Sequence, residues 1–270
     1  RTISLRKLKK ATKNFCIDGR VGEGGSAHVF RGTYCESGQI VAVKRLKPAE
    51  GRNASYNREL GVLSHLSHPN IIRLIGRCAH EDTERIIVYE FMPLRTLYDH
   101  LHARPAGVEA LAWDMRMRIG AGLAKGLSYL HNEADPRVIY RDLKPRNVLL
   151  GEDYHPKISD FGIAISAPSN DRSSSVTVTD LMGTPPYWAP EGALSDRLSP
   201  KSDVYSFGVL LLEIIAGTVP MDARRPRYVA DWVTLQILIN ILKDNYCFFF
   251  FFFFFLNLAS CIIIVLYGLR

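Results

Sequence analysis

Two segments near the middle of the chain carry carboxylate, amide and lysine side chains at spacings that suit phosphoryl transfer. In the first, Asp142 precedes Asn147 by five residues and Lys144 lies between them, with apolar residues on both sides. One such loop can hold a carboxylate near a substrate hydroxyl and an amide oxygen near a metal ion. In the second, Asp160 directly precedes Phe161-Gly162, and its carboxylate can bind Mg²⁺. We therefore predict that Asp142 and Lys144 are catalytic and that Asn147 and Asp160 bind a metal ion.

A glycine-rich stretch near the N-terminus is suited to binding phosphate through its backbone. Gly22-Glu23-Gly24-Gly25 lies between two strand-like segments, and backbone N–H groups can approach a phosphate there because no Cβ stands in the way. On its own the cluster also fits a hairpin turn, and Ala27 stands where a G-x-G-x-x-G pattern has its third glycine. The nucleotide-binding residues predicted in this region are Val21, Gly22, Gly24, Gly25 and Val29.

A lysine and a glutamate farther along the chain are candidates to complete such a phosphate site. Lys44 ends the apolar run Val41-Ala42-Val43, where it is either an exposed charge at a strand edge or a point charge for phosphate oxygens. In the second role a lysine needs a carboxylate to hold it. Glu59 is the candidate, although on its helical segment it could equally be an ordinary solvated residue. Taken singly, each residue fits its ordinary role at least as well, and a catalytic role for Lys44 and Glu59 rests on their combination with the other motifs.

The elements that must position these groups change in character near Glu90. Before it, short β-branched runs such as 40–43 and 86–89 predict strands, and one helix is expected over Tyr56–Leu66. After it, apolar residues recur at helical spacing, which predicts helices around the ranges 97–101, 113–130 and 204–215. Strands first and helices afterwards predict an α+β fold of two lobes with a cleft between them.

Length, composition and charge limit the classes of protein. The 270 residues are 47% apolar, enough for a buried core, and the formal net charge is +7 with a pI near 9.2. The Lys and Arg residues are scattered apart from short clusters such as 6–10. We interpret the excess as solvated surface with weak attraction to acidic lipid, and expect no nucleic-acid partner.

Five cysteines without paired spacing favour a reducing compartment such as the cytosol. Since the chain starts at Arg1 without the apolar core of a signal peptide, we expect a fragment.

In order and spacing, these motifs resemble those of the protein kinases. The resemblance rests on Gly22–Val29, Lys44, Glu59, Arg141-Asp142, Asn147, Asp160-Phe161-Gly162 and Ala189-Pro190-Glu191. It implies a two-lobed protein kinase fold: a flanking segment 1–16, a small β-rich N-lobe over 17–92, and a helical C-lobe over 93–233 that lacks its last helices. The implied cofactors are ATP and Mg²⁺, with Mn²⁺ as an alternative metal.

The resemblance also implies roles for single residues. Lys44 would bind the α- and β-phosphates with Glu59 as its ion-pair partner, Asp142 would act as the base, and Asn147 and Asp160 would bind Mg²⁺. A hinge from Glu90 to Met92 would contact adenine through its backbone, next to Tyr89 at the gatekeeper position. The complete predicted nucleotide-binding set is Val21, Gly22, Gly24, Gly25, Val29, Ala42, Lys44, Glu90 and Met92.

Longer phrases resemble plant receptor-like kinases, and especially the receptor-like cytoplasmic kinases, in which Tyr, here Tyr140, commonly replaces the usual His before Arg141. These phrases are Leu8–Phe15, Val88–Met92, Val138–Asp142 and Lys201–Gly208. A separate resemblance, to Ser/Thr-specific kinases, rests on Lys144 and on Gly183–Tyr187. Thr184 is expected to be a structural or substrate-positioning hydroxyl. Arg141 implies control by phosphorylation, because an arginine needs an anion to pair with. The candidate sites in the activation segment are Ser173, Ser174, Ser175, Thr177 and Thr179.

The tail from Thr234 onward matches neither lobe. It holds eight consecutive Phe residues, 248–255, within about 21 mostly apolar residues, 247–267, which are enough to span a bilayer. Three interpretations stay open: a C-terminal membrane anchor, sequence translated from a T-rich intron, and a buried core helix. We favour the second, because the tail of 234–270 stands where further kinase helices are expected. Without those helices, Glu191 would lack the arginine that it usually pairs with.

The leading hypothesis is an ATP-dependent Ser/Thr protein kinase that transfers the γ-phosphate to protein hydroxyls in signal transduction. The alternatives are a nucleotide-binding scaffold without turnover and an unstable chain without a function of its own. The expected partners are a protein substrate with Ser or Thr and an upstream receptor kinase, and association with a membrane is expected as well. The expected location is the cytoplasm, at the plasma membrane, with a single-pass C-terminal anchor as the less favoured alternative.

Overall fold

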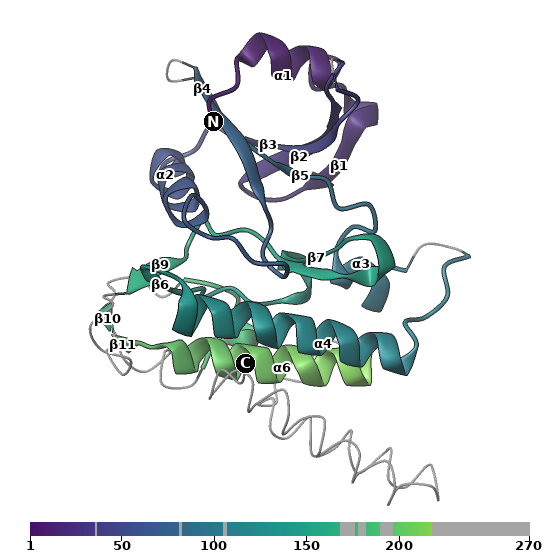
Figure 1. Ribbon diagram of the computed structural model, residues 1–270, viewed down its shortest axis with the longest axis vertical. Coiled ribbons are helices and arrows are strands. Elements are labelled where there is room, and N and C mark those ends of the chain that lie inside the picture. Colours follow the sequence, from purple (N-terminus) through teal and green to yellow (C-terminus); the bar gives the residue numbers. More distant parts are fainter. Residues whose placement is uncertain are drawn as a thin grey trace, which may run out of the picture.

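A five-stranded antiparallel sheet forms the first lobe of the computed structural model (Figure 1). The structure describes residues 1–35, 37–80, 83–104, 107–167, 176–177, 182–189 and 197–217. The strand order is β1-β2-β3-β5-β4, and one helix, α2, lies between β3 and β4 in the chain. The bounds are β1 Arg20–Glu23, β2 Ala27–Thr33, β3 Ile40–Leu46, α2 Arg52–Leu63, β4 Leu74–His80 and β5 Glu84–Glu90. The predicted strands and the single helix among them are confirmed.

The two faces of this sheet have different roles because side chains alternate along a strand. In β3, Val41 and Val43 belong to an apolar cluster on the outer face, together with Val88 of β5. Ala42 and Lys44, one residue out of phase, lie on the inner face. Lys44 therefore points away from the outer cluster and toward the second lobe.

The first residues of the chain pack on the outer face of the sheet. Ile3 donates its amide to the Arg77 carbonyl at 2.8 Å, so residues 1–3 run beside the edge strand β4. Helix α1 (Leu5–Ala11) follows and buries Leu8 completely in the outer cluster. Gly76 permits this approach, since a Cβ there would lie 2.6 Å from the Ile3 side chain and 2.9 Å from the Arg1 carbonyl. Residues 1–11 are thus a packed part of the first lobe.

The second lobe is mainly helical, with α4 and α6 lying side by side across it (Figure 1). Two short strand pairs, β6 with β9 and β7 with β8, lie in the part of the chain between α4 and α6. The bounds are α3 Leu97–Leu101, α4 Trp113–Ser128, β6 Arg137–Ile139, β7 Val148–Leu150, β8 Pro156–Ile158, β9 Ile165–Ala167, β10 Val176–Thr177, β11 Arg197–Leu198 and α6 Pro200–Ala216. Single turns lie at η1 Ile17–Gly19, η2 Tyr129–Glu133, η3 Pro145–Asn147, η4 Glu152–Tyr154 and η5 Pro185–Tyr187.

The helix boundaries differ from the sequence-based ones by a few residues. Helix α2 begins at Arg52 after the left-handed Gly51 (φ 73°) and ends at Leu63, so it is shifted toward the N-terminus relative to the predicted 56–66. Helix α6 begins four residues before the predicted 204 because Pro200 occupies its first position, and it ends at the left-handed Gly217 (φ 68°). Apolar periodicity located the helices, while capping residues set their ends.

One continuous apolar cluster joins the two lobes. It runs from Leu60 of α2 and Ile87 of β5 through Phe161 to Leu123 of α4 and Leu210 of α6. The predicted α+β fold with two lobes is confirmed. The predicted tail from 234 to 270 lies outside the described residues, and no helix within the described ranges is long and apolar enough to cross a membrane.

Candidate functional site

Lys44, Glu59 and Tyr89 meet on the inner face of the sheet. The Lys44 Nζ lies 2.8 Å from Glu59 Oε2 and 3.2 Å from Oε1, and the Tyr89 hydroxyl donates to Glu59 Oε1 at 2.5 Å. Glu59 is fully buried, so its charge depends on these two donors. The predicted Lys44–Glu59 pair is present in the structure. The hydroxyl contact of Tyr89 was not foreseen, because its residue type alone does not show which way the ring points.

Asp160 brings the second lobe to the same lysine. Its Oδ1 lies 2.9 Å from the Lys44 Nζ, although the two residues are 116 positions apart. Burial lowers the pKa of Lys44, but the carboxylates of Glu59 and Asp160 outweigh it and raise that pKa above its ordinary value. In turn, the nearby Lys44 charge lowers the pKa of Asp160. Both side chains are therefore ionised at neutral pH, as phosphate binding and metal binding require.

Asp142 is the centre of a second polar cluster, in the loop before η3. Its Oδ2 accepts hydrogen bonds from the Lys144 Nζ at 2.7 Å and from the Asn147 Nδ2 at 2.8 Å. Its Oδ1 accepts one from the Thr184 hydroxyl at 2.7 Å, and Lys144 also donates to that hydroxyl oxygen at 2.8 Å. A serine or threonine hydroxyl can therefore reach Asp142 with a lysine beside it. This is the arrangement that a base and a substrate hydroxyl need.

Asp203 of α6 holds the backbone of the loop that leads to Asp142. The backbone amides of Tyr140 and Arg141 each donate to its carboxylate at 2.8 Å, and the His131 Nε2 lies 2.8 Å from Oδ2. Asp203 is completely buried, so these donors replace its lost hydration. Sequence reasoning missed this anchor. The signal was one of two carboxylates on a mainly apolar helix, with no spacing rule to connect it with backbone amides 62 and 63 residues earlier.

The predicted metal ligands are brought together by the backbone between them. Ser159 donates its amide and its hydroxyl to the Asn147 carbonyl, both at 2.9 Å, so Asp160 follows directly beside Asn147. The Tyr140 hydroxyl donates to the Ser159 carbonyl, and the Tyr140 ring packs edge-on against Phe161 with centroids 5.1 Å apart. Asn147 uses its Nδ2 on Asp142, which leaves its amide oxygen for a cation. One carboxylate and one amide oxygen fit Mg²⁺, which takes its other ligands from phosphate and water.

The glycine-rich turn lies at the open end of the inner face. Gly22 pairs with Val29 across the β1–β2 hairpin, and Gly24 donates its amide to the Ala27 carbonyl at 2.9 Å. A Cβ on Gly24 or Gly25 would meet nothing within 4 Å, and neither residue has a positive φ. Packing and backbone geometry therefore do not require glycine at these two positions. The open space beside them is available to a ligand, which suits the predicted phosphate cradle.

The predicted nucleotide-binding residues lie along β1, β2, β3 and the end of β5. Ala42 faces Tyr89 across the β3–β5 pair, and Val29 faces Lys44 across β2–β3, while Val21 is exposed in β1. The Glu90 carboxylate is turned to Arg73 and Lys157, so only its backbone could contact a base. The Met92 amide has no acceptor among the described residues and is available as a donor for adenine.

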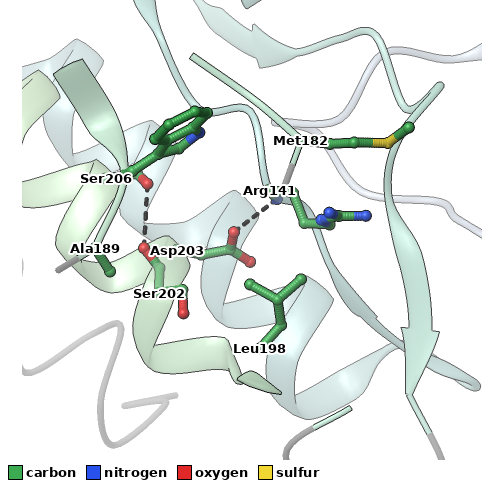
Figure 2. A pocket seen from close by; sticks show the side chains of 8 residues that line it. Arg141, Met182, Ala189, Leu198, Ser202, Asp203 and Ser206 are labelled. Atoms are coloured by element: carbon green, nitrogen blue, oxygen red, sulfur yellow. Dashed lines mark hydrogen bonds between the residues drawn. The ribbon is translucent and has the colours of Figure 1, made fainter. Parts of the chain in front are cut away.

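A separate pocket lies beside Arg141, and Figure 2 shows Arg141 and Asp203 in its wall. It is lined by Arg141, Met182, Trp188, Ala189, Leu198, Ser202, Asp203 and Ser206. None of the predicted nucleotide-binding residues belongs to it. Of the predicted phosphorylation sites, Thr177 lies in β10 opposite Arg197 of β11. Ser173, Ser174, Ser175, Thr179 and Glu191 lie outside the described residues.

Comparison with known proteins agrees with this geometry. Residues 15–246 match the family model described as "Protein kinase domain". Over 226 residues the chain is 50% identical to "Serine/threonine-protein kinase PBS1" of Arabidopsis thaliana, which covers 83% of this chain and 49% of that protein. It is 51% identical over 227 residues to "Serine/threonine-protein kinase PBL27" of the same plant, covering 83% of this chain and 44% of that protein.

A third relative in the same plant carries a receptor-like name. "Receptor-like kinase LIP2" is 44% identical over 224 residues, which cover 83% of this chain and 40% of that protein. The resemblance to plant receptor-like and receptor-like cytoplasmic kinases is thereby confirmed. The chain spans about half the length of the curated relatives it matches.

Proposed function

Because this chain belongs to the protein kinase family, we propose that it transfers the γ-phosphate of ATP to serine or threonine hydroxyls of other proteins. The observation that carries the proposal is the contact of Asp142 with both Lys144 and the Thr184 hydroxyl. A substrate hydroxyl that took the place of Thr184 would meet the same carboxylate and the same lysine. This contact supports Ser and Thr as the acceptors, since an aliphatic hydroxyl already occupies the position beside the proposed base.

The chain's own residues divide the chemistry between two clusters. Asp142 orients the attacking hydroxyl and accepts its proton, while Lys144 lies beside the oxygen that attacks and neutralises charge there. Lys44, held by Glu59, supplies a fixed positive charge to the phosphates of the nucleotide. Protein kinase domains use ATP with a divalent cation, and we propose Mg²⁺ at Asn147 and Asp160, where it would neutralise the charge that develops on the phosphates.

Regulation and location follow as further parts of the proposal. Phosphorylation of the activation segment by an upstream receptor kinase would regulate the protein, with Arg141 as the proposed phosphate-binding residue and Thr177 as the one candidate site that lies among the described residues. The site of action would be the cytoplasmic side of the plasma membrane, where receptor kinases signal. The protein substrate is expected to present a Ser or Thr in an accessible loop.

An assay with labelled ATP, Mg²⁺ and a general protein substrate tests the proposal. The wild-type chain should label the substrate on serine or threonine, as phosphoamino-acid analysis would show, while Asp142→Asn should bind ATP and leave the substrate unlabelled. Equal labelling by both proteins would refute the enzyme assignment. ATP binding without labelling by either protein would instead support a nucleotide-binding scaffold.

A further inference from the structure

The positive charge of this chain is concentrated at its N-terminus. The whole chain has 34 Lys and Arg against 27 Asp and Glu, a formal charge of +7. Residues 1–17 contain six of these basic residues, at positions 1, 6, 7, 9, 10 and 13, and no acidic one. The remaining 253 residues therefore hold 28 basic and 27 acidic side chains and are nearly neutral. The net excess thus lies in the N-terminal segment that contains the short cluster 6–10, while 28 of the 34 basic residues are spread over the rest of the chain.

The fold gathers four of these cations on one surface. Arg6, Lys9 and Lys10 follow the i, i+3, i+4 spacing of a single helix face on α1, and Lys13 follows in the next turn. All four are exposed, whereas Leu8 on the opposite face is buried against the sheet. We call this surface the α1 basic face, meaning Arg6, Lys9, Lys10 and Lys13. Its orientation is fixed because the other side of α1 is part of the core.

The α1 basic face has no counter-charge within the described part of the chain. None of its four residues forms an ion pair or a cation–π contact there, and the first acidic residue in sequence is Asp18. Lys7 differs, since its ammonium lies 5.0 Å from the centre of the Tyr34 ring. Four unpaired cations held on one rigid face repel one another. An external anionic partner would relieve that repulsion.

An exposed apolar residue follows the residues of this face in the sequence. Ile17 is 62% exposed, the highest value among the large apolar side chains that the structure describes. It belongs to η1, the first turn after the segment that carries Lys13. Figure 1 shows α1 at the end of the molecule farthest from α6, and Asp142 lies in the chain between β6 and η3, in the same lobe as α6. A partner bound at α1 would leave the catalytic cluster accessible.

We propose that the α1 basic face docks the protein onto an anionic lipid surface. Clusters of Lys and Arg near a membrane are attracted to acidic headgroups, and an exposed isoleucine can insert at the headgroup boundary. Three of the four cations are lysines, which bind as point charges without fixed geometry, whereas an acidic peptide is better matched by the arginine fork. The exposed, convex face of the helix can contact the spread-out negative charge of a lipid surface without a fitted binding pocket. This docking does not depend on the proposed phosphoryl transfer.

The docking is electrostatic, since the apolar side of α1 is already buried in the protein and cannot enter the bilayer. Each Lys or Arg near an anionic surface contributes roughly a fivefold gain in partitioning. Removing four of them should lower partitioning by roughly several hundredfold. The attraction should also fall steeply with salt, because screening shortens the range of the field.

Sedimentation with lipid vesicles tests the proposal on the full chain. The wild type should bind vesicles of phosphatidylcholine with phosphatidylserine at low salt, release them at high salt, and ignore vesicles of phosphatidylcholine alone. The variant Arg6→Gln/Lys9→Gln/Lys10→Gln/Lys13→Gln should lose the binding by roughly several hundredfold. A matched control, Arg104→Gln/Arg118→Gln/Lys125→Gln/Lys201→Gln, removes the same charge from exposed positions of the second lobe and should stay within about twofold of wild type.

Four outcomes would overturn the proposal. Equal binding to neutral vesicles would assign membrane attachment to an apolar segment elsewhere in the chain. Equal losses of vesicle binding in the two variants would show that the attraction depends on the net charge of the protein and not on the α1 basic face. Insensitivity of the wild type to salt would contradict an electrostatic contact without using any variant. Tighter binding of polyglutamate than of vesicles, through the same four residues, would identify an acidic protein as the partner.

Discussion

Glu59 shows how one buried charge organises the nucleotide half of the site. It has no exposure to water and is held by Lys44 and Tyr89, which come from two different strands. Removing one partner of a buried ion pair costs more than the pair is worth, because the remaining charge is left without hydration. The stability of the first lobe and its catalytic competence are thus linked through a single carboxylate.

Substitution of Lys44 tests this link. Lys44→Met should abolish phosphoryl transfer and lower the free energy of unfolding by about 3 kcal/mol, because Glu59 would remain charged and buried with only Tyr89 as donor. The double variant Lys44→Met/Glu59→Gln should recover more than half of that loss while staying inactive. Urea unfolding of the three proteins measures the effect. A double variant no more stable than Lys44→Met would contradict a buried unpaired charge.

At the scale of elements, α1 is expected to stabilise the sheet it covers. Leu8→Ala should cost about 2 to 4 kcal/mol of unfolding free energy, because Leu8 is fully buried between α1 and the outer face of the sheet. Lys9→Ala, the next residue on the exposed face, should change stability by less than about 0.5 kcal/mol. Chemical denaturation compares the two. Equally small changes in unfolding free energy for the two variants would mean that the packing of α1 does not stabilise the sheet.

A second element-scale contact joins α6 to the segments around it. Glu213 of α6 is fully buried, accepts the Tyr187 hydroxyl of η5 at 2.7 Å, and lies 2.6 Å from the His102 Nε2, directly after α3. Burial raises the pKa of Glu213 above its ordinary value, and hydrogen bonds from Tyr187 and His102 only partly offset it. The folded protein therefore holds this proton more tightly than the unfolded chain does.

The pH dependence follows from that direction. The stability contributed by a protonated Glu213 is complete below the ordinary pKa of 4.5 and is lost as pH rises through the raised folded pKa. The glutamine in Glu213→Gln cannot titrate. The melting temperature of this variant should therefore rise relative to that of the wild type as pH rises from about 4 to about 7. Thermal unfolding across this range measures the difference. A difference that is constant, or that falls with pH, would show that Glu213 is not protonated preferentially in the folded state.

The parts of the site that sequence reasoning found are those set by local order. Asp142 and Asn147 share one loop, and strand alternation places Lys44 on the inner face, so their roles could be predicted from spacing. Asp203 and Glu213 could not, because a carboxylate on an apolar helix gives no sign of which neighbour it meets until the helices pack. The packing of residues 1–11 was missed for the same reason, since their register with β4 depends on Gly76, far along the chain.

At the scale of the whole molecule, one apolar cluster joins the two lobes beside the candidate site. The shared apolar cluster passes through Phe161, next to Asp160, which contacts Lys44 of the first lobe. Asp142 belongs to the second lobe and is held through the loop that Asp203 anchors. The proposed phosphoryl transfer would therefore require the cluster around Lys44 and the cluster around Asp142 to be positioned together, since neither lobe carries the whole candidate site.

The most direct test of the kinase assignment is the single-turnover rate of γ-phosphate transfer at saturating ATP and Mg²⁺, compared between wild type and Asp142→Asn. The account predicts that ATP affinity stays within about twofold, because Asp142 makes no contact with Lys44 or the glycine-rich turn, while the transfer rate falls by roughly 10² to 10⁴. A transfer rate for Asp142→Asn within a few-fold of wild type would contradict it.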